Sequence, residues 1–245
     1  MDVTGVSGRE PVPVYDRGLR GTLLLFLTAC GGSTSDLLPP GEPCGAPSPQ
    51  SGEGTYYAAT GAGACGFPAS SATPLLVAAM NAPNWSGSGV CGMCAKVTGP
   101  LGEVTVKIVD LCPECAAGDL DLSPAAFDMI AERSAGRVPI TWTEVPCATA
   151  GPLIYHFKDG SNPWWTAIQI RDHRHRIAGL AVRTTSGDWQ PISRLDYNYF
   201  VVENLGAGPY ALRVTDVHGH EVVDDSIALG DDADRSSAAQ LSTCE

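Results

Sequence analysis

Three aspartates near the middle of the sequence have the types and spacing of a chemically active group. Asp110 ends a run in which apolar and polar residues alternate, and Asp119 and Asp121 follow a turn bracketed by two cysteines. An acid on the inward phase of a strand end is either buried and paired or placed at the lip of a cleft. Converging carboxylates can serve as general acid and base. The alternative interpretation, solvated loop acids, fits the pattern equally well.

The elements that must position these acids are short. Residues 103–110 alternate as a strand, with one apolar face. Ser123 and Pro124 fit the N-cap and first residue of a helix over 124–135. A final alternating strand covers 138–145. Short strands with one helix predict a compact β-barrel over residues 53–147.

Length, charge and cysteine content limit the class of protein. The 245 residues suffice for one large or two modest domains. The net charge of −12 argues against nucleic acid as a partner. Nine cysteines are many for a cytosolic protein, and they indicate an oxidising compartment.

The N-terminal segment is typical of a secretory signal. Arg17 and Arg20 precede an apolar run over 22–29, which is too short to span a bilayer as a helix. The residues Leu-Thr-Ala before Cys30 resemble a bacterial lipobox. We therefore expect residues 1–30 to be a signal segment, with Cys30 as a lipidated first residue of the mature protein. A plain signal peptide with a coincidental cysteine stays open, as does the true translation start.

The remainder divides into four parts. Residues 31–52 are rich in Gly, Ser, Pro and Thr and predict a linker that contains Cys44. The barrel region follows. Residues 151–229 contain no cysteine and predict an all-β domain, and 230–245 predict an acidic tail anchored by Cys244. The strands expected in the second domain cover 153–157, 165–171, 177–184, 200–203 and 210–217.

Two Cys-x-x-Cys pairs, at 91–94 and 112–115, have the spacing of a four-thiolate zinc site. Secretion favours disulfides instead, because exported cysteines are usually oxidised. We expect disulfides and no metal or cofactor, with zinc as the alternative.

Aromatic residues of the second domain predict a flat binding surface. Trp164 and Trp165 are adjacent, and strict strand alternation would bury Trp164 together with Ile168. Pro163 permits an irregular start at which both rings face outward, and exposed aromatics suit stacking on sugar rings. Two core tryptophans are the alternative. The basic cluster 171–176 is interpreted as a solvated turn rather than an anion site.

The chain resembles bacterial expansins over residues 53–228. No single motif is decisive, but their order and spacing together are specific. The motifs are Gly-Thr-Tyr-Tyr at 54–57, Cys-Gly-Met-Cys at 91–94, Val-Asp-Leu-Cys-Pro-Glu at 109–114, Asp-Leu-Ser-Pro at 121–124, Trp-Trp-Thr-Ala-Ile-Gln-Ile-Arg at 164–171 and Leu-Asp-Tyr-Asn-Tyr-Phe at 195–200.

The resemblance implies a mainly β protein, in which a six-stranded double-psi β-barrel is followed by an immunoglobulin-like, carbohydrate-binding β-sandwich. It implies wall loosening without hydrolysis. The implied polysaccharide-binding residues are Thr55, Asp110 and Asp121 in the barrel groove, with Asp121 critical for activity, and Trp164, Trp165 and Tyr197 with nearby Lys158 on the sandwich. Cys112 stands where relatives often have tyrosine.

The resemblance also implies disulfides between Cys65 and Cys91 and between Cys94 and Cys147. This leaves Cys112 to pair with Cys115, and Cys44 with Cys244.

Glycoside hydrolysis normally needs two carboxylates on opposite sides of the bond. Residues 54–60, where related barrel endoglucanases carry the base, contain no carboxylate. We therefore expect a non-catalytic protein in which neighbouring Asp110 raises the pKa of Asp121 and makes it a hydrogen-bond donor. The alternatives are a lytic enzyme that uses Asp121 as general acid on peptidoglycan or glucan, and a purely adhesive lipoprotein.

The expected partners are cellulose, hemicellulose or other wall glucans, with peptidoglycan open and no nucleic acid. The protein is expected to be a monomer that is secreted or lipid-anchored at the bacterial cell surface or outer membrane, with membrane contact only through the lipid. The sequence does not identify the preferred polymer.

Overall fold

The structure is a computed structural model that describes residues 45 and 47–244. The signal segment, lipidation at Cys30 and the pairing of Cys44 lie outside these residues. None of the helices in the described part of the chain is long and apolar enough to cross a membrane.

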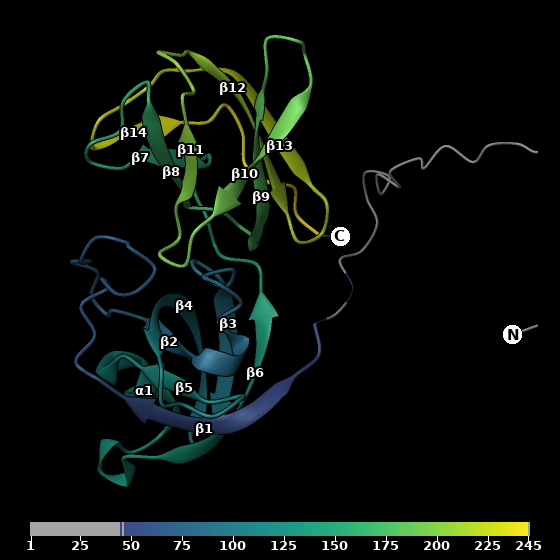
Figure 1. Ribbon diagram of the computed structural model, residues 1–245. Coiled ribbons are helices and arrows are strands. Elements are labelled where there is room, and N and C mark those ends of the chain that lie inside the picture. The colour runs from purple at the N-terminus through teal and green to yellow at the C-terminus, as the bar shows by residue number, and fades with distance from the viewer. Residues whose placement is uncertain (1–44, 46, 245) are drawn as a thin grey trace, which may run out of the picture. The chain divides into compact units, whose positions relative to one another are not determined.

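The first half of the described chain is a closed six-stranded barrel (Figure 1). Its strands are β1 (Gln50–Tyr56), β2 (Val77–Asn81), β3 (Cys94–Gly99), β4 (Gly102–Cys112), β5 (Leu120–Leu122) and β6 (Val138–Val145). They follow the order β1-β5-β2-β4-β3-β6, and β6 pairs back onto β1. Closure leaves no unpaired edge. Strand β1 begins at Gln50, so its first residues belong to the segment expected to be linker.

The parallel pairs in the barrel bring distant segments together. Strand β1 runs parallel to β5, and β2 runs parallel to β4. Parallel neighbours need crossover connections, so residues far apart in sequence become adjacent. Thr55 and Asp121 are one such pair.

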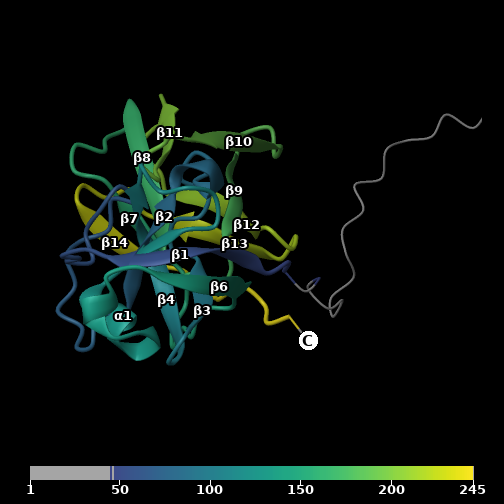
Figure 2. The same ribbon diagram turned by 90° about the horizontal axis from the view of Figure 1, so that it is seen from below.

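Helix α1 (Pro124–Ile130) is capped as the sequence predicts. Ser123 Oγ accepts a hydrogen bond from the Ala126 backbone N–H at 3.3 Å, and Pro124 occupies the first turn. The helix is shorter than expected, because a separate 3₁₀ turn covers Arg133–Ala135. Helix α1 packs against β1 and β4 (Figure 2). Its apolar face is buried.

Three disulfides cross-link the barrel region. They join Cys65 to Cys91 and Cys94 to Cys147, as the resemblance implies, and Cys112 to Cys115, the pair expected by elimination. The two Cys-x-x-Cys pairs therefore do not form the alternative four-thiolate zinc site, because all four sulfurs are in disulfide bonds. Cys244 is also disulfide-bonded.

The second half is an eight-stranded β-sandwich. Its strands are β7 (Ile154–Phe157), β8 (Trp165–Arg171), β9 (Ile177–Arg183), β10 (Trp189–Arg194), β11 (Phe200–Glu203), β12 (Tyr210–Asp216), β13 (Glu221–Ile227) and β14 (Ala233–Ser236). They follow the order β13-β12-β9-β10-β11-β8-β7-β14. Buried side chains from both halves of this order, such as Phe157, Ile168 and Leu212, share one apolar core.

The segment expected to be an acidic tail contributes to this fold instead. Strand β14 pairs with β7, and Leu241 is fully buried in the sandwich core. Asp231 accepts a hydrogen bond from the Gly160 backbone N–H at 2.7 Å. Backbone pairing and one apolar anchor outweigh the polar composition of this segment, which is why a tail was the wrong expectation.

Hydrogen bonds and an ion pair join the barrel to the sandwich. The Cys65 carbonyl accepts from Gln169 Nε2 at 2.9 Å and from Asn198 Nδ2 at 3.1 Å. Arg176 Nε donates to both carboxylate oxygens of Glu144, at 2.9 and 2.8 Å. The basic cluster is therefore not a solvated turn as expected, because Arg176 is paired across the junction and His173 is buried.

Candidate functional site

Thr55 and Asp121 form the centre of the barrel's polar site. They are register partners in the parallel pair of β1 and β5, so their side chains emerge on the same face. Thr55 Oγ1 donates a hydrogen bond to Asp121 Oδ1 at 2.6 Å. A contact this short between a hydroxyl and a carboxyl oxygen is typical of a charge-assisted bond, and it fixes the orientation of the acid.

Asp110 lies in the same row of residues across the barrel. On β2, Ala79 is the register partner of Asp110 on one side and of Asp121 on the other. Two strand spacings therefore separate the backbones of the two acids, about 10 Å. The residues Asp110, Ala79, Asp121 and Thr55 thus form a continuous row across four strands, which we call the acidic row.

Burial is the main reason that the pKa of Asp121 is raised above its ordinary value. The Glu114 carboxylate raises it further, and Asp110 has a smaller effect in the same direction. The Thr55 hydrogen bond and the Arg137 charge oppose the shift. The sequence-based hypothesis gave Asp110 the leading role, but at two strand spacings its charge acts weakly.

A small cavity of about 120 Å³ borders Asp121. Its walls include the Cys112–Cys115 turn, which carries Glu114. The Asp119 carboxylate has a structural role, because it accepts hydrogen bonds from the Glu53 and Ala116 backbone N–H groups. Glu114 is exposed and has no such partner in the described chain, so it is the free carboxylate beside Asp121. Sequence reasoning passed over it as a turn residue.

Asp110 holds a barrel loop close to the site. Its Oδ1 accepts hydrogen bonds from the Ala64 backbone N–H at 2.7 Å and from the Leu111 N–H at 2.9 Å. Gly63 lies so near that an added Cβ would approach Asp110 Cγ to 2.3 Å. The loop can therefore close over Asp110 only with glycine at this position.

Tyr57 is a further site residue that sequence reasoning missed. Burial raises the pKa of its hydroxyl above the ordinary value, and the charges of Asp110 and Asp121 raise it further. The hydroxyl therefore stays protonated, and it feels the charge of both acids. The sequence could have indicated this residue, because Tyr57 follows Thr55 by two positions and alternate residues of a strand face the same side.

Two aromatic side chains of the predicted binding surface, Trp164 and Tyr197, face outward. Trp164 is 72% exposed and Tyr197 is 40% exposed, whereas Trp165 is half-buried at the start of β8. Asn162 Oδ1 accepts hydrogen bonds from the backbone N–H groups of both tryptophans, at 2.9 and 3.1 Å. This turn breaks the alternation, so the alternative in which both tryptophans lie in the core is wrong.

A short barrel segment connects the acidic row to this aromatic surface. Ala64 is hydrogen-bonded to Asp110, and Cys65 is hydrogen-bonded to Gln169 and Asn198 of the sandwich. Asn198 is the neighbour of Tyr197 in sequence. Lys158 lies in the β7–β8 connection, which also carries Trp164, and its side chain is half-buried.

Comparisons with known proteins agree with this architecture. Residues 50–142 match a protein-family model described as "Lytic transglycolase". Expansin-YoaJ of Bacillus subtilis (strain 168) is 40% identical over 140 residues, which cover 57% of this chain and 60% of that protein. Expansin-like protein 1 of Dictyostelium discoideum is 30% identical over 178 residues, covering 67% and 62%.

Solved structures extend the match across both domains. The crystal structure of the apo form of the Clavibacter michiganensis expansin has a TM-score of 0.73 and 31% identity, covering 79% of this chain and 98% of that one. A mutant of the same expansin, solved in complex with cellohexaose, also has a TM-score of 0.73, at 30% identity.

The closed six-stranded barrel followed by a β-sandwich defines a two-domain double-psi barrel protein. Within that class, the chain belongs to the expansin family. It spans 60% and 62% of the length of the two curated relatives named above.

Proposed function

We propose that the protein loosens plant-type cell walls without hydrolysis, by binding cellulose or related glucans and disrupting their non-covalent contacts. The observation that carries this proposal is that Thr55 stands in register beside Asp121 and bonds to it at 2.6 Å. A hydrolase needs a second carboxylate across the scissile bond. On β1 the neighbour of Asp121 is a hydroxyl, which can position the acid but cannot activate water as a carboxylate does.

Asp121 supplies the polar contact with the glycan. Its raised pKa favours the protonated form, which donates a hydrogen bond to a glycan hydroxyl. Such a donor competes for the hydroxyl contacts that neighbouring glucan chains make with each other. Repeated exchange of these contacts lets one chain slip along the next without breaking a covalent bond.

The aromatic surface supplies the apolar contact with the glycan. Trp164 and Tyr197 are exposed, and flat rings of this kind stack on the apolar faces of sugars. The related Clavibacter michiganensis structure contains cellohexaose, which supports an unbranched glucan as the ligand class. The net charge of −12 disfavours acidic polymers, so uncharged cellulose or hemicellulose is the proposed substrate.

A sedimentation assay tests the ligand class. The purified protein is incubated with cellulose, xylan and peptidoglycan, and bound protein is measured in each pellet. We expect binding to cellulose that the double variant Trp164→Ala/Trp165→Ala loses. Binding to peptidoglycan alone, unaffected by this variant, would overturn the proposal.

A lytic activity on peptidoglycan or glucan is the second candidate. It is favoured by the free carboxylate of Glu114 beside Asp121 and by the family description that matches residues 50–142. A transglycosylase needs only one general acid, and Asp121 would be that acid. A third candidate, a purely adhesive lipoprotein, predicts that Asp121 substitutions leave all behaviour unchanged.

The cellular setting follows from the same proposal. Three disulfides among the described residues are consistent with export to an oxidising compartment. We propose a secreted monomer, tethered to the cell surface through lipid on Cys30. Mass analysis of the mature N-terminus for a diacylglyceryl group tests the tether.

A further inference from the structure

A group of histidines lies in the sandwich, on segments that carry none of the glycan-site residues named above. His175 is in the β8–β9 connection, Asp216 is the last residue of β12, and His218 and His220 are in the β12–β13 turn. His175 is 4% exposed and Asp216 is 2% exposed. The chain has five histidines, and three of them meet here.

The carboxylate of Asp216 is fixed by its own turn. Oδ1 accepts hydrogen bonds from the His218 backbone N–H at 2.8 Å and from the His220 N–H at 2.9 Å. Oδ2 lies 2.8 Å from His220 Nδ1. One oxygen is therefore committed to the backbone, and the other is held beside an imidazole nitrogen.

His175 is oriented from its other side. Its Nε2 lies 3.1 Å from the Ser242 carbonyl oxygen, to which it donates. This hydrogen bond places the proton on Nε2 and leaves Nδ1 with a lone pair. A backbone carbonyl that accepts from one ring nitrogen is the usual support of a metal-binding histidine. The His175 and His220 ring centroids are 5.8 Å apart.

We propose that His175, Asp216 and His220 bind one divalent transition-metal ion. One ligand atom from each residue lies within 4.8 Å of the others. The 2.8 Å between Asp216 Oδ2 and His220 Nδ1 is close to the roughly 3 Å between adjacent ligands with bonds of about 2.1 Å. Two imidazoles with one carboxylate suit zinc, copper or nickel rather than calcium.

Binding requires one proton rearrangement. In the metal-free protein, His220 Nδ1 carries the proton that it shares with Asp216 Oδ2. When the ion takes that position, the proton moves to Nε2 of the same ring, so the imidazole stays neutral and no oxidant or reductant is needed. His175 keeps its Nε2 proton on the Ser242 carbonyl.

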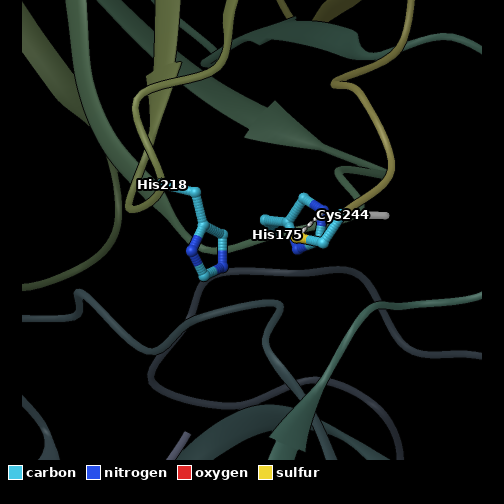
Figure 3. A group of neighbouring side chains, drawn as sticks. All are labelled: His175, His218 and Cys244. Carbon is cyan, nitrogen blue, oxygen red and sulfur yellow. Dashed lines mark hydrogen bonds between the residues drawn. The ribbon is translucent and has the colours of Figure 1, made fainter. Parts of the chain in front are cut away.

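A second combination, His175, His218 and Cys244, also brings ligand atoms within 4.8 Å (Figure 3). Cys244 is disulfide-bonded and therefore supplies no thiolate. The set that contains Asp216 keeps its ligand chemistry in the oxidised protein, so it is the one that we assign.

The bound ion would tie together the β8–β9 connection, the β12–β13 turn and, through Ser242, the C-terminal segment. An ion that binds only the folded state stabilises it by mass action. We therefore expect zinc to raise the melting temperature of the full chain by several degrees.

Calorimetric titration of the EDTA-dialysed, purified full chain with Zn²⁺ tests the proposal. We expect one equivalent to bind, and His220→Gln and His175→Ala to weaken the affinity by at least tenfold. Two controls are matched. His156→Ala removes another His–Asp pair, whose Nδ1–Oδ1 distance is 2.8 Å, and His218→Ala removes a neighbouring ring outside the assigned set.

Each outcome decides the assignment. The assignment is supported if His220→Gln and His175→Ala weaken Zn²⁺ binding while both controls keep the wild-type affinity. The assignment is overturned if the wild type does not bind one equivalent of Zn²⁺. It is also overturned if His218→Ala loses Zn²⁺ binding while His220→Gln keeps it. If a ligand variant fails to fold, electron paramagnetic resonance of the Cu²⁺-loaded wild type replaces it: two imidazole nitrogens in the ligand field are expected, and none would refute the site.

Discussion

Thr55 Oγ1 lies 2.6 Å from Asp121 Oδ1, on a neighbouring strand that reaches it from 66 residues away in sequence. The hydrogen bond stabilises the charged carboxylate and lowers the pKa of Asp121, against the stronger effect of burial. Removing the hydroxyl in Thr55→Val therefore raises that pKa. Because we propose that the protonated acid is active, loosening should persist to higher pH in this variant.

The measurement is a pH profile of loosening activity, paired with an NMR titration of the Asp121 carboxyl carbon. Thr55→Ser keeps the hydroxyl and is the matched control, with a profile close to wild type. A Thr55→Val profile displaced to lower pH would contradict the proposed protonation state.

Asp121→Asn should stabilise the fold near neutral pH. The folded-state pKa of Asp121 is raised, so the folded state prefers the protonated acid. The associated stability is fully present below the unfolded-state pKa and is lost as the pH rises through the folded-state pKa. Asparagine never ionises and should avoid this loss. We expect a higher melting temperature than wild type at pH 7 and no difference at pH 3, measured by calorimetry.

Trp164→Ala should weaken cellulose binding without unfolding the protein. The ring is 72% exposed, so its removal leaves no core cavity. An aromatic stacking contact contributes about 0.5–1.5 kcal/mol, which corresponds to a loss of roughly 2- to 13-fold in affinity. Leu101→Ala removes another exposed apolar side chain (62%), from the barrel, and serves as the control. Equal losses in the two variants would show that the effect is not specific to the aromatic surface.

Gly63→Ala should reduce loosening while leaving binding through Trp164 intact. The new Cβ would lie 2.3 Å from Asp110 Cγ, so the loop must move and the bond from the Ala64 N–H must weaken. Gly179→Ala is the control, because no atom lies within 4 Å of its added Cβ. Retained loosening in Gly63→Ala would show that the Asp110 loop is not part of the active groove.

Glu114→Gln separates loosening from lysis. If Glu114 only tunes the charge around Asp121, its removal lowers the pKa of Asp121 and leaves a protein that still loosens cellulose at acidic pH. If Glu114 is a catalytic base, the wild type releases muropeptides or oligosaccharides and the variant does not. Product analysis by mass spectrometry distinguishes the two outcomes.

The sequence predicted most of the fold where local signals are strong. Strand β8 has the predicted bounds, and Ser123 caps α1 as expected, because apolar alternation and capping are local properties. Strands β13 and β14 were missed, because they are largely polar and are held by backbone pairing at the sheet edges. Strand β10 was missed for a different reason, because Pro191 interrupts its strand pattern.

The site was harder to predict than the fold. Asp121 and Thr55 were recognised through the family resemblance, and only the β1–β5 register shows that they touch. Glu114 and Tyr57 were missed, because their proximity to Asp121 depends on a disulfide-bounded turn and on barrel closure. The exposure of Trp164 was left open, since it depends on the Asn162 turn.

The most direct test of the central claim is the number of soluble reducing ends released from amorphous cellulose while the same protein sample weakens cellulose paper. The account predicts weakening by the wild type, no release above that of Asp121→Ala, which removes the hydrogen-bond donor, and loss of weakening in that variant. Reducing ends that accumulate with time and disappear in Asp121→Ala would show that the protein cuts its substrate, and would contradict the account.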